Sequence, residues 1–234
     1  MNDIIDFFIA PYTNTQFIYI LLEFIAAFFG IVSVFYAKKE NILVFPTGVI
    51  STGLYIYLLY RWQLFGDLII NIYYTLMSLY GWYIWIKAVD EDQNHIQITK
   101  SSKLDYIKSL VIFAFSSIFV MIVYIKFNVI DTSMDFYSTL KFVWNHLTSG
   151  SASQFRMITP YVDTFTTGAA FAAMWMMANK KLENWILWII VNIVSIPLYF
   201  IKGFGFTGMQ YLVFLVLAVF GYFSWVKNIK VRNV

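Results

Sequence analysis

The sequence predicts an all-α integral membrane protein with seven transmembrane helices, arranged as two parallel three-helix repeats joined by a linker helix (3+1+3). Of its 234 residues, 60% are hydrophobic and 12% are charged, whereas about 25% are charged in an ordinary soluble domain. The apolar runs are about 20 residues long, which a helix needs to cross about 30 Å of hydrocarbon, whereas barrel strands would be about ten residues long. Short motifs also recur in the two halves of the chain.

Residues 1–16 combine apolar side chains with two acids and a proline. This pattern predicts a short interfacial helix that ends at Pro11, because proline cannot continue a helix. We do not expect a cleavable signal peptide, because Asp3 and Asp6 occupy the region that would have to be positively charged.

Seven apolar runs follow, and each can cross the membrane as a helix. They are expected at residues 17–37, 41–60, 66–86, 106–127, 161–178, 184–201 and 207–226. Residues 17–86 then form the first repeat, 106–127 the linker helix and 161–227 the second repeat. The connection 128–160 is too long for a tight turn, so we expect it to be extracytoplasmic and partly helical. Residues 228–234 form a basic cytoplasmic tail.

The repeat is visible at two turns and at two helix ends. KKEN at 38–41 precedes the second run and KKLEN at 180–184 precedes the sixth, while Gly81–Trp85 and Gly221–Trp225 end the third and seventh. Aligning the two asparagines of the turns requires a three-residue change in one loop. Three crossings are an odd number, so a linker helix is needed to restore the orientation of the second unit. Coincidence is the alternative, because such motifs are common in membrane helices.

Basic residues orient the predicted bundle. Eleven lysines and arginines fall on one side of the seven crossings and five on the other. The side richer in positive charge usually faces the cytoplasm. We therefore expect the N-terminus outside and the C-terminus in the cytoplasm.

Several functional classes find no support in the sequence. The chain has no cysteine, which excludes disulfides and cysteine-based metal sites or nucleophiles. It has no Walker loop, HExxH or GxSxG motif and no convincing acid–base pair, so we expect no enzyme, no metal and no cofactor. The net charge of +3 does not indicate nucleic-acid binding, because basic residues in a membrane protein usually report topology.

The segment 185–199, WILWIIVNIVSIPLY, carries the strongest candidate site. Trp188 and Asn192 are four residues apart and Tyr199 lies seven further on, so all three share one helix face. An amide in hydrocarbon is costly unless it meets a partner or a ligand. The face therefore suits a flat polar ligand, including a cationic one. The alternative is a packing face whose asparagine is bonded to a neighbouring helix.

Other polar residues inside the runs are further candidates. Asn71 shares a face with Ser78 in the third run, where Tyr74 also lies, and either pore lining or interhelical contact would suit it. Glu23 is an acid within the first run, which favours a functional role, although an acid near a helix end can be structural. Trp175 lies well inside its run and can stack on a ligand.

Two pairs of residues near the ends of runs have simpler readings. Asp67 and Asp163 open the third and fifth runs, where the helix dipole favours a carboxylate. Pro46 and Pro197 are expected at corresponding depths in the two halves, as hinges or as plain kinks.

These motifs together resemble the PnuC family of vitamin transporters, best known for nicotinamide riboside. The resemblance covers residues 17–228. It rests on Trp188-x3-Asn192-x6-Tyr199, Gly81-Trp82-x2-Trp85, Gly66-Asp67, Asp163, Thr167, Lys202, Thr207 and Tyr211.

The resemblance implies a SWEET-like fold in the inner membrane of a bacterium. It further implies uptake of nicotinamide riboside by facilitated diffusion, trapping by cytoplasmic phosphorylation, and a homo-oligomer, expected to be a trimer. Trp188 and Asn192 match the family's substrate-contacting motif, and Thr167 and Tyr211 belong to the same resemblance. Asn71 stands where family members often carry glutamine, and relatives carry thiamine, so thiamine stays an alternative substrate. A membrane scaffold or sensor without transport is the alternative from another class.

Overall fold

A computed structural model describes residues 15–62, 65–90, 97–130, 133–202 and 205–232. Within these ranges every named secondary-structure element is a helix, which confirms the predicted all-α fold. The helices are α2 (Phe17–Lys38), α3 (Val44–Arg61), α4 (Phe65–Asp90), α5 (Lys103–Lys126), α6 (Phe136–Thr148), α7 (Ala152–Met157), α8 (Thr159–Ala178), α9 (Asn184–Lys202) and α10 (Gly205–Arg232). The interfacial helix predicted before Pro11 lies outside the described residues.

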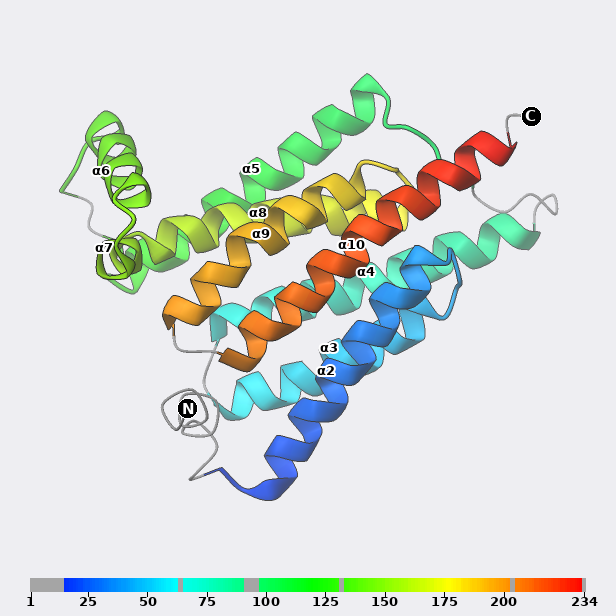
Figure 1. The fold of residues 1–234 in the computed structure, drawn as a ribbon, viewed down its shortest axis with the longest axis horizontal. Coiled ribbons are helices and arrows are strands. Elements are labelled where there is room, and N and C mark those ends of the chain that lie inside the picture. The colour runs from blue at the N-terminus through cyan, green and yellow to red at the C-terminus, as the bar shows by residue number, and fades with distance from the viewer. Residues whose placement is uncertain (1–14, 63–64, 91–96, 131–132, 203–204, 233–234) are drawn as a thin grey trace.

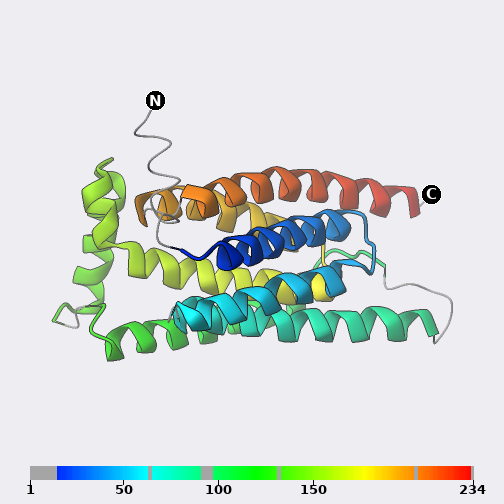
Figure 2. The same ribbon diagram turned by 90° about the horizontal axis from the view of Figure 1, so that it is seen from below.

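The long helices lie side by side in one bundle, and α6 and α7 sit at one end of it (Figures 1 and 2). Among the described helices, four are long and apolar enough to cross a membrane: α2, α5, α9 and residues Thr207–Ile229 of α10. By contrast, α8 is rich in alanine and threonine and is largely buried, as expected of a close-packing helix.

Helix neighbours follow the chain within each half. In the first half α3 packs between α2 and α4, and in the second half α9 packs on α8 and α10. The halves meet where α10 contacts α2 and where α4 contacts α8, and α5 packs along α8. The two contacts between halves therefore join the third helix of each half to the first helix of the other.

Aromatic contacts at one end of the bundle recur in both halves. The Phe45 and Trp85 rings meet edge to face at 4.8 Å, and the Trp185 and Trp225 rings do so at 5.5 Å. In both comparisons, Phe45 with Trp185 and Trp85 with Trp225, the residue numbers differ by 140.

Trp85 and Trp225 also hydrogen-bond to the other half of the chain. The Trp85 indole N–H donates to the Ala178 carbonyl at 2.9 Å, and the Trp225 N–H donates to the Ala37 carbonyl at 3.1 Å. Each bond satisfies a carbonyl in the last turn of a helix, which has no partner within that helix.

The same offset of 140 relates the two turns that precede α3 and α9. Glu40 and Lys180 both have left-handed backbones, with φ of 55° and 48°. Their side chains are buried and form an ion pair, with Lys180 Nζ 3.5 Å from Glu40 Oε2. The predicted alignment of Asn41 with Asn184 is therefore wrong, and no three-residue change is needed. In the alignment by 140, Lys180 corresponds to Glu40. The pair Lys180–Lys181 therefore lies two residues later than the pair Lys38–Lys39.

Glycines make the close contacts at this end possible. A Cβ added at Gly81 would lie 2.4 Å from Phe45 Cε1, and one added at Gly221 would lie 2.6 Å from Trp185 Cη2. We expect Gly81→Ala and Gly221→Ala each to destabilise the protein by about 1–3 kcal/mol, because rigid rings would have to move. Thermal unfolding in detergent measures the loss. Gly53→Ala is the matched control: nothing lies within 4 Å of its added Cβ, so it should be neutral or stabilising.

The two prolines do not occupy corresponding depths, so that expectation is wrong. Pro46 lies in the first turn of α3, which begins at Val44, where its missing N–H would have no helical partner in any case. Pro197 lies inside α9, in its second half, where it removes a backbone hydrogen bond. Only Pro197 is therefore placed to loosen a helix.

The connection between α5 and α8 contains the two short helices. Asp135 caps α6 by accepting a hydrogen bond from the Ser138 backbone N–H at 3.1 Å. Hydrogen bonds from Ser138 lower the pKa of the Asp135 carboxyl below its ordinary value. The carboxylate therefore stays ionised near neutral pH, and its negative charge stabilises the N-terminus of α6.

Candidate functional site

The α9 face predicted from the sequence is directed into the bundle. Asn192 is only 2% exposed, and no described residue hydrogen-bonds its amide. Trp188, one turn earlier, is half-buried and meets the Tyr74 ring at 6.3 Å, with 61° between the planes. Both aromatic rings also contact the buried cluster that includes Ala170 and Val191. An aromatic wall and an unbonded amide thus lie next to each other inside the bundle.

Comparison with the first half shows that the Asn192 amide is unusual. Thr52, its counterpart at the offset of 140, hydrogen-bonds Thr75 of α4, with the two hydroxyl oxygens 2.6 Å apart. The counterpart of Thr75 is Leu215, which has no polar atom in its side chain. The helix pair that satisfies Thr52 therefore leaves Asn192 without the matching partner.

Tyr199 and Tyr211 form the next layer of the site. Their rings stack 4.9 Å apart with 16° between the planes, so one face of each ring is already covered. The Tyr211 hydroxyl interacts with the side chains of Tyr199 and Ser195. This layer offers hydroxyl groups and ring edges to a ligand.

Asn71 is turned back on its own helix. Its amide nitrogen donates to the Asp67 carbonyl at 2.9 Å, one turn earlier in α4. A ligand can use this amide nitrogen only if that bond breaks. This nitrogen makes no hydrogen bond to another described helix, and pore lining by Asn71 stays a prediction.

Tyr73 fixes α4 to α8 beside the site. Its ring stacks on Phe171 at 3.7 Å with 4° between the planes, and its hydroxyl donates to the Phe171 carbonyl at 3.0 Å. The sequence did not single out Phe171, because a lone phenylalanine in an apolar run gives no signal. Tyr74, the next residue, is thereby placed against Trp188.

Glu23 belongs to a neighbouring polar group. Its carboxylate acts electrostatically on the Tyr55 hydroxyl, which reaches Gln210 Oε1 of α10 at 3.5 Å. A direct role of Glu23 at the aromatic wall stays a prediction.

Two further candidates lie on α8. Thr167 is buried and none of the described residues hydrogen-bonds its hydroxyl, so it resembles Asn192 in this respect. Trp175 is half-buried, and its backbone carbonyl accepts from the Asn179 amide at 2.8 Å. None of the ring contacts within the described ranges brings Trp175 to Trp188, so its role in stacking stays a prediction.

Asp163 forms an ion pair at the end of the bundle where α8 begins and α9 ends. It lies in the second turn of α8, where it pairs with Lys202 of α9 and accepts a hydrogen bond from the Tyr124 hydroxyl at 3.2 Å. The Lys202 ammonium also lies 5.4 Å from the centre of the Tyr199 ring. The prediction that Asp163 lies in the first turn of its helix is therefore wrong. Asp163 instead links α8 to α5 and α9. Asp67 does lie in the first turn of α4.

Removing one member of this pair should cost more than removing both. We expect Asp163→Asn and Lys202→Met each to lower the unfolding temperature, because each leaves a partly buried charge without its partner. The double variant should recover much of the loss. A double-mutant cycle on thermal unfolding measures the coupling, and strictly additive losses would show that the pair contributes nothing as a unit.

The arrangement suits recognition of a flat polar molecule. It combines aromatic rings with an amide and hydroxyl groups. In the described part of the chain, no group of three or more His, Cys, Asp or Glu residues could hold a metal ion.

Known proteins share this sequence pattern over nearly the whole chain. A family model described as nicotinamide mononucleotide transporter matches residues 20–227. The chain belongs to this family, the PnuC family. It is accordingly a multi-pass membrane protein of a transporter family.

Individual PnuC proteins are distant but similar over most of their length. The nicotinamide riboside transporter PnuC of Neisseria mucosa is 27% identical over 216 residues, covering 89% of this chain and 73% of the relative. The protein of the same description from Escherichia coli K12 is 20% identical over 216 residues, covering 91% and 87%. The crystal structure of the vitamin B3 transporter PnuC matches with a TM-score of 0.62 and 26% identity, covering 90% of this chain and 82% of that one.

Proposed function

We propose that this PnuC protein carries nicotinamide riboside across the membrane by facilitated diffusion. The observation that carries the proposal is the buried Asn192 amide, which no described residue bonds, one turn from Trp188 and its neighbour Tyr74. The full-length relatives described as nicotinamide riboside transporters support the choice of substrate.

The chemistry of nicotinamide riboside fits this face. Its pyridinium ring is flat and cationic, and stacking on Trp188 would stabilise it by roughly 1–2 kcal/mol when desolvated. Asn192 would bond its carboxamide or a ribose hydroxyl. Thr167 and the Tyr199 and Tyr211 hydroxyls would bind its remaining polar groups, and the carboxylate of Glu23 would favour the positive charge.

Transport would use two halves that move relative to each other. In this proposal α2–α4 and α8–α10 are parallel repeats and α5 is the linker, giving seven crossings in a 3+1+3 arrangement. The ring contacts that recur at the offset of 140 support this division. Repeats related by an axis along the membrane normal bind substrate near the midplane between them. Pro197 would absorb the bend in α9 as access alternates.

The remaining features follow the family resemblance and the charge pattern. The protein would lie in the cytoplasmic membrane with its N-terminus outside and its C-terminus inside, as the uneven lysine and arginine distribution indicates. Phosphorylation in the cytoplasm would trap the imported vitamin, and the chain would act as a homotrimer without enzymatic activity of its own.

A tryptophan-fluorescence titration of the purified protein tests the substrate. We expect saturable quenching by nicotinamide riboside that is reduced in Trp188→Phe. Thiamine, which is also an aromatic cation, is the comparison ligand. Quenching by thiamine alone would keep the site but reject the proposed substrate, and a response to neither vitamin would favour a scaffold without transport.

A further inference from the structure

The short helix α6 lies at one end of the bundle (Figures 1 and 2). It runs across the direction of the long helices at the end where α5 ends and α8 begins (Figures 1 and 2). A helix turns about 100° per residue, so its thirteen residues, Phe136–Thr148, can be sorted by the side they face. They divide into three sectors of different character.

The first sector faces the bundle. Phe142 and Val143 pack against the buried cluster formed by Ile158, Val162 and Leu198 at the ends of α8 and α9. The His146 ring lies 4.0 Å from the Phe142 ring on the same side of the helix, and Thr139 belongs to this sector as well. This sector fixes how α6 is rotated about its own axis.

The second sector is apolar and exposed. It consists of Phe136, Tyr137, Leu140, Trp144 and Leu147. Tyr137 is 73% exposed and Trp144 is 65% exposed. On a helix these positions form one continuous stripe next to the sector that faces the bundle.

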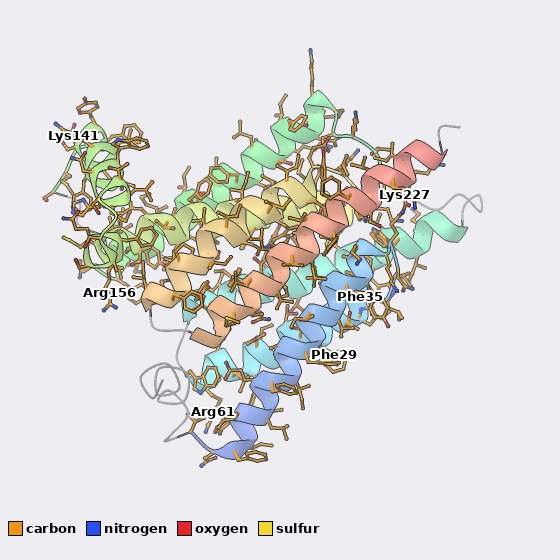
Figure 3. The ribbon with its side chains drawn as sticks, viewed as in Figure 1. Phe29, Phe35, Arg61, Lys141, Arg156 and Lys227 are labelled. Carbon is orange, nitrogen blue, oxygen red and sulfur yellow. The ribbon has the colours of Figure 1, made fainter. Side chains whose placement is uncertain are left out.

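The third sector is polar and exposed. It consists of Ser138, Lys141, Asn145 and Thr148. Figure 3 shows Lys141 on α6 at the outer edge of the molecule, away from the long helices. Each sector thus covers about a third of the helix circumference: one on protein, one apolar and one polar.

We infer that α6 is an interfacial helix whose apolar stripe, the second sector, is inserted into the lipid surface at this end of the protein. A helix placed there has one side on the bundle, one in the acyl-chain boundary and one in water, which accounts for all three sectors. Tyrosine and tryptophan are the side chains enriched at that depth, because they combine an apolar ring with a polar group.

The lipid-facing surface of the long helices continues toward the stripe. On α5 the side chains of Ile118, Ile122 and Ile125 are exposed, and beyond its end Phe127 and Val129 are exposed as well. These residues lead from the spanning helix to the connection that carries α6. Lys141 adds a positive charge within reach of phosphate headgroups.

The insertion would bear on the proposed transport site through α7 and α9. In α7 the Arg156 guanidinium donates to the Ile201 carbonyl at 2.8 Å, in the last turn of α9 (Figure 3). Through Phe142 and Val143, α6 also packs near Leu198 on the same part of α9. An anchored α6 therefore braces the last turn of α9, which follows Pro197.

Site-directed spin labelling tests the insertion directly, because the chain has no cysteine of its own. Single cysteines would replace Leu140 and Trp144 in the apolar stripe, and Lys141 and Asn145 in the polar sector as matched controls. Each spin-labelled protein is reconstituted into lipid nanodiscs, and the collision of the label with oxygen and with a water-soluble nickel complex is measured.

The expected result is a reversal between adjacent positions. Labels at 140 and 144 should collide with oxygen and lose nickel access, whereas labels at 141 and 145 should show strong nickel access. Equal nickel access at all four positions would place α6 in water and overturn the inference. Low access of both reagents at 140 and 144 would show that protein, such as a second copy of the chain, covers the stripe, and would also overturn it.

Discussion

Replacing Asn192 by leucine is expected to abolish most nicotinamide riboside uptake while leaving the protein at least as stable as the wild type. The amide is buried and no described residue bonds it, so in the absence of ligand it carries a desolvation cost that leucine removes. With ligand bound, the lost hydrogen bonds are worth about 1–3 kcal/mol, which is roughly a 5- to 150-fold weaker interaction. Uptake and thermal unfolding measured on the same preparation separate the two effects.

Thr52→Val provides the matched control, because Thr52 is the counterpart of Asn192 in the first half. Its hydroxyl bonds Thr75 at 2.6 Å, so its removal should lower the unfolding temperature and leave uptake largely intact. The opposite pattern would contradict this account. If Asn192→Leu unfolds at a lower temperature and still transports, Asn192 is a packing residue.

Replacing Trp188 by alanine should have a comparable effect on binding. The substitution removes the ring proposed to stack on the pyridinium, worth about 1–2 kcal/mol, together with its contact to Tyr74. We expect affinity for nicotinamide riboside to fall by about tenfold or more. Trp188→Phe should retain part of the affinity, since phenylalanine still offers an aromatic face. Isothermal titration calorimetry on the detergent-solubilised protein measures both.

Trp175 is the comparison for this prediction. It is half-buried in α8, and none of the ring contacts in the described part of the chain brings it to Trp188. If the substrate stacks on Trp188 and not on Trp175, Trp175→Phe should bind nicotinamide riboside with nearly unchanged affinity. An equal loss in both phenylalanine variants would show that the substrate does not stack on Trp188 in particular.

Much of the fold could be predicted because membrane helices follow simple rules of length and composition. The motifs Gly81–Trp85 and Gly221–Trp225 marked equivalent positions in α4 and α10, where both tryptophans pack in the same way, although both helices continue beyond them. The alignment of the turns failed because it compared side chains, whereas the equivalent positions in the two turns are defined by their backbone conformation. Glu40 and Lys180 share a left-handed backbone but have opposite charges.

The candidate site was predictable in part. Trp188 and Asn192 could be grouped because spacing along one helix fixes which residues share a face. Contacts between helices could not be read in this way. Tyr124 of α5 hydrogen-bonds Asp163 of α8, which pairs with Lys202 of α9. The periodicity of side chains within one helix cannot predict such contacts between helices.

Asn71 shows the same limit within a single helix. An asparagine in an apolar run can turn toward a ligand, bond a neighbouring helix, or donate to a carbonyl four residues earlier. The sequence does not distinguish these, and the structure has the last, with Asp67 as the acceptor. Leu215, the counterpart of Thr75, was equally silent, because leucine in a membrane helix carries no signal.

Uptake of radiolabelled nicotinamide riboside by proteoliposomes that contain only the purified protein tests the proposed transport most directly. No ion gradient, kinase or nucleotide is present. We predict saturable uptake that stops when the internal concentration equals the external one, and that unlabelled nicotinamide riboside competes with it. Uptake no faster than in protein-free liposomes, or accumulation above the external concentration, would contradict facilitated diffusion of this vitamin.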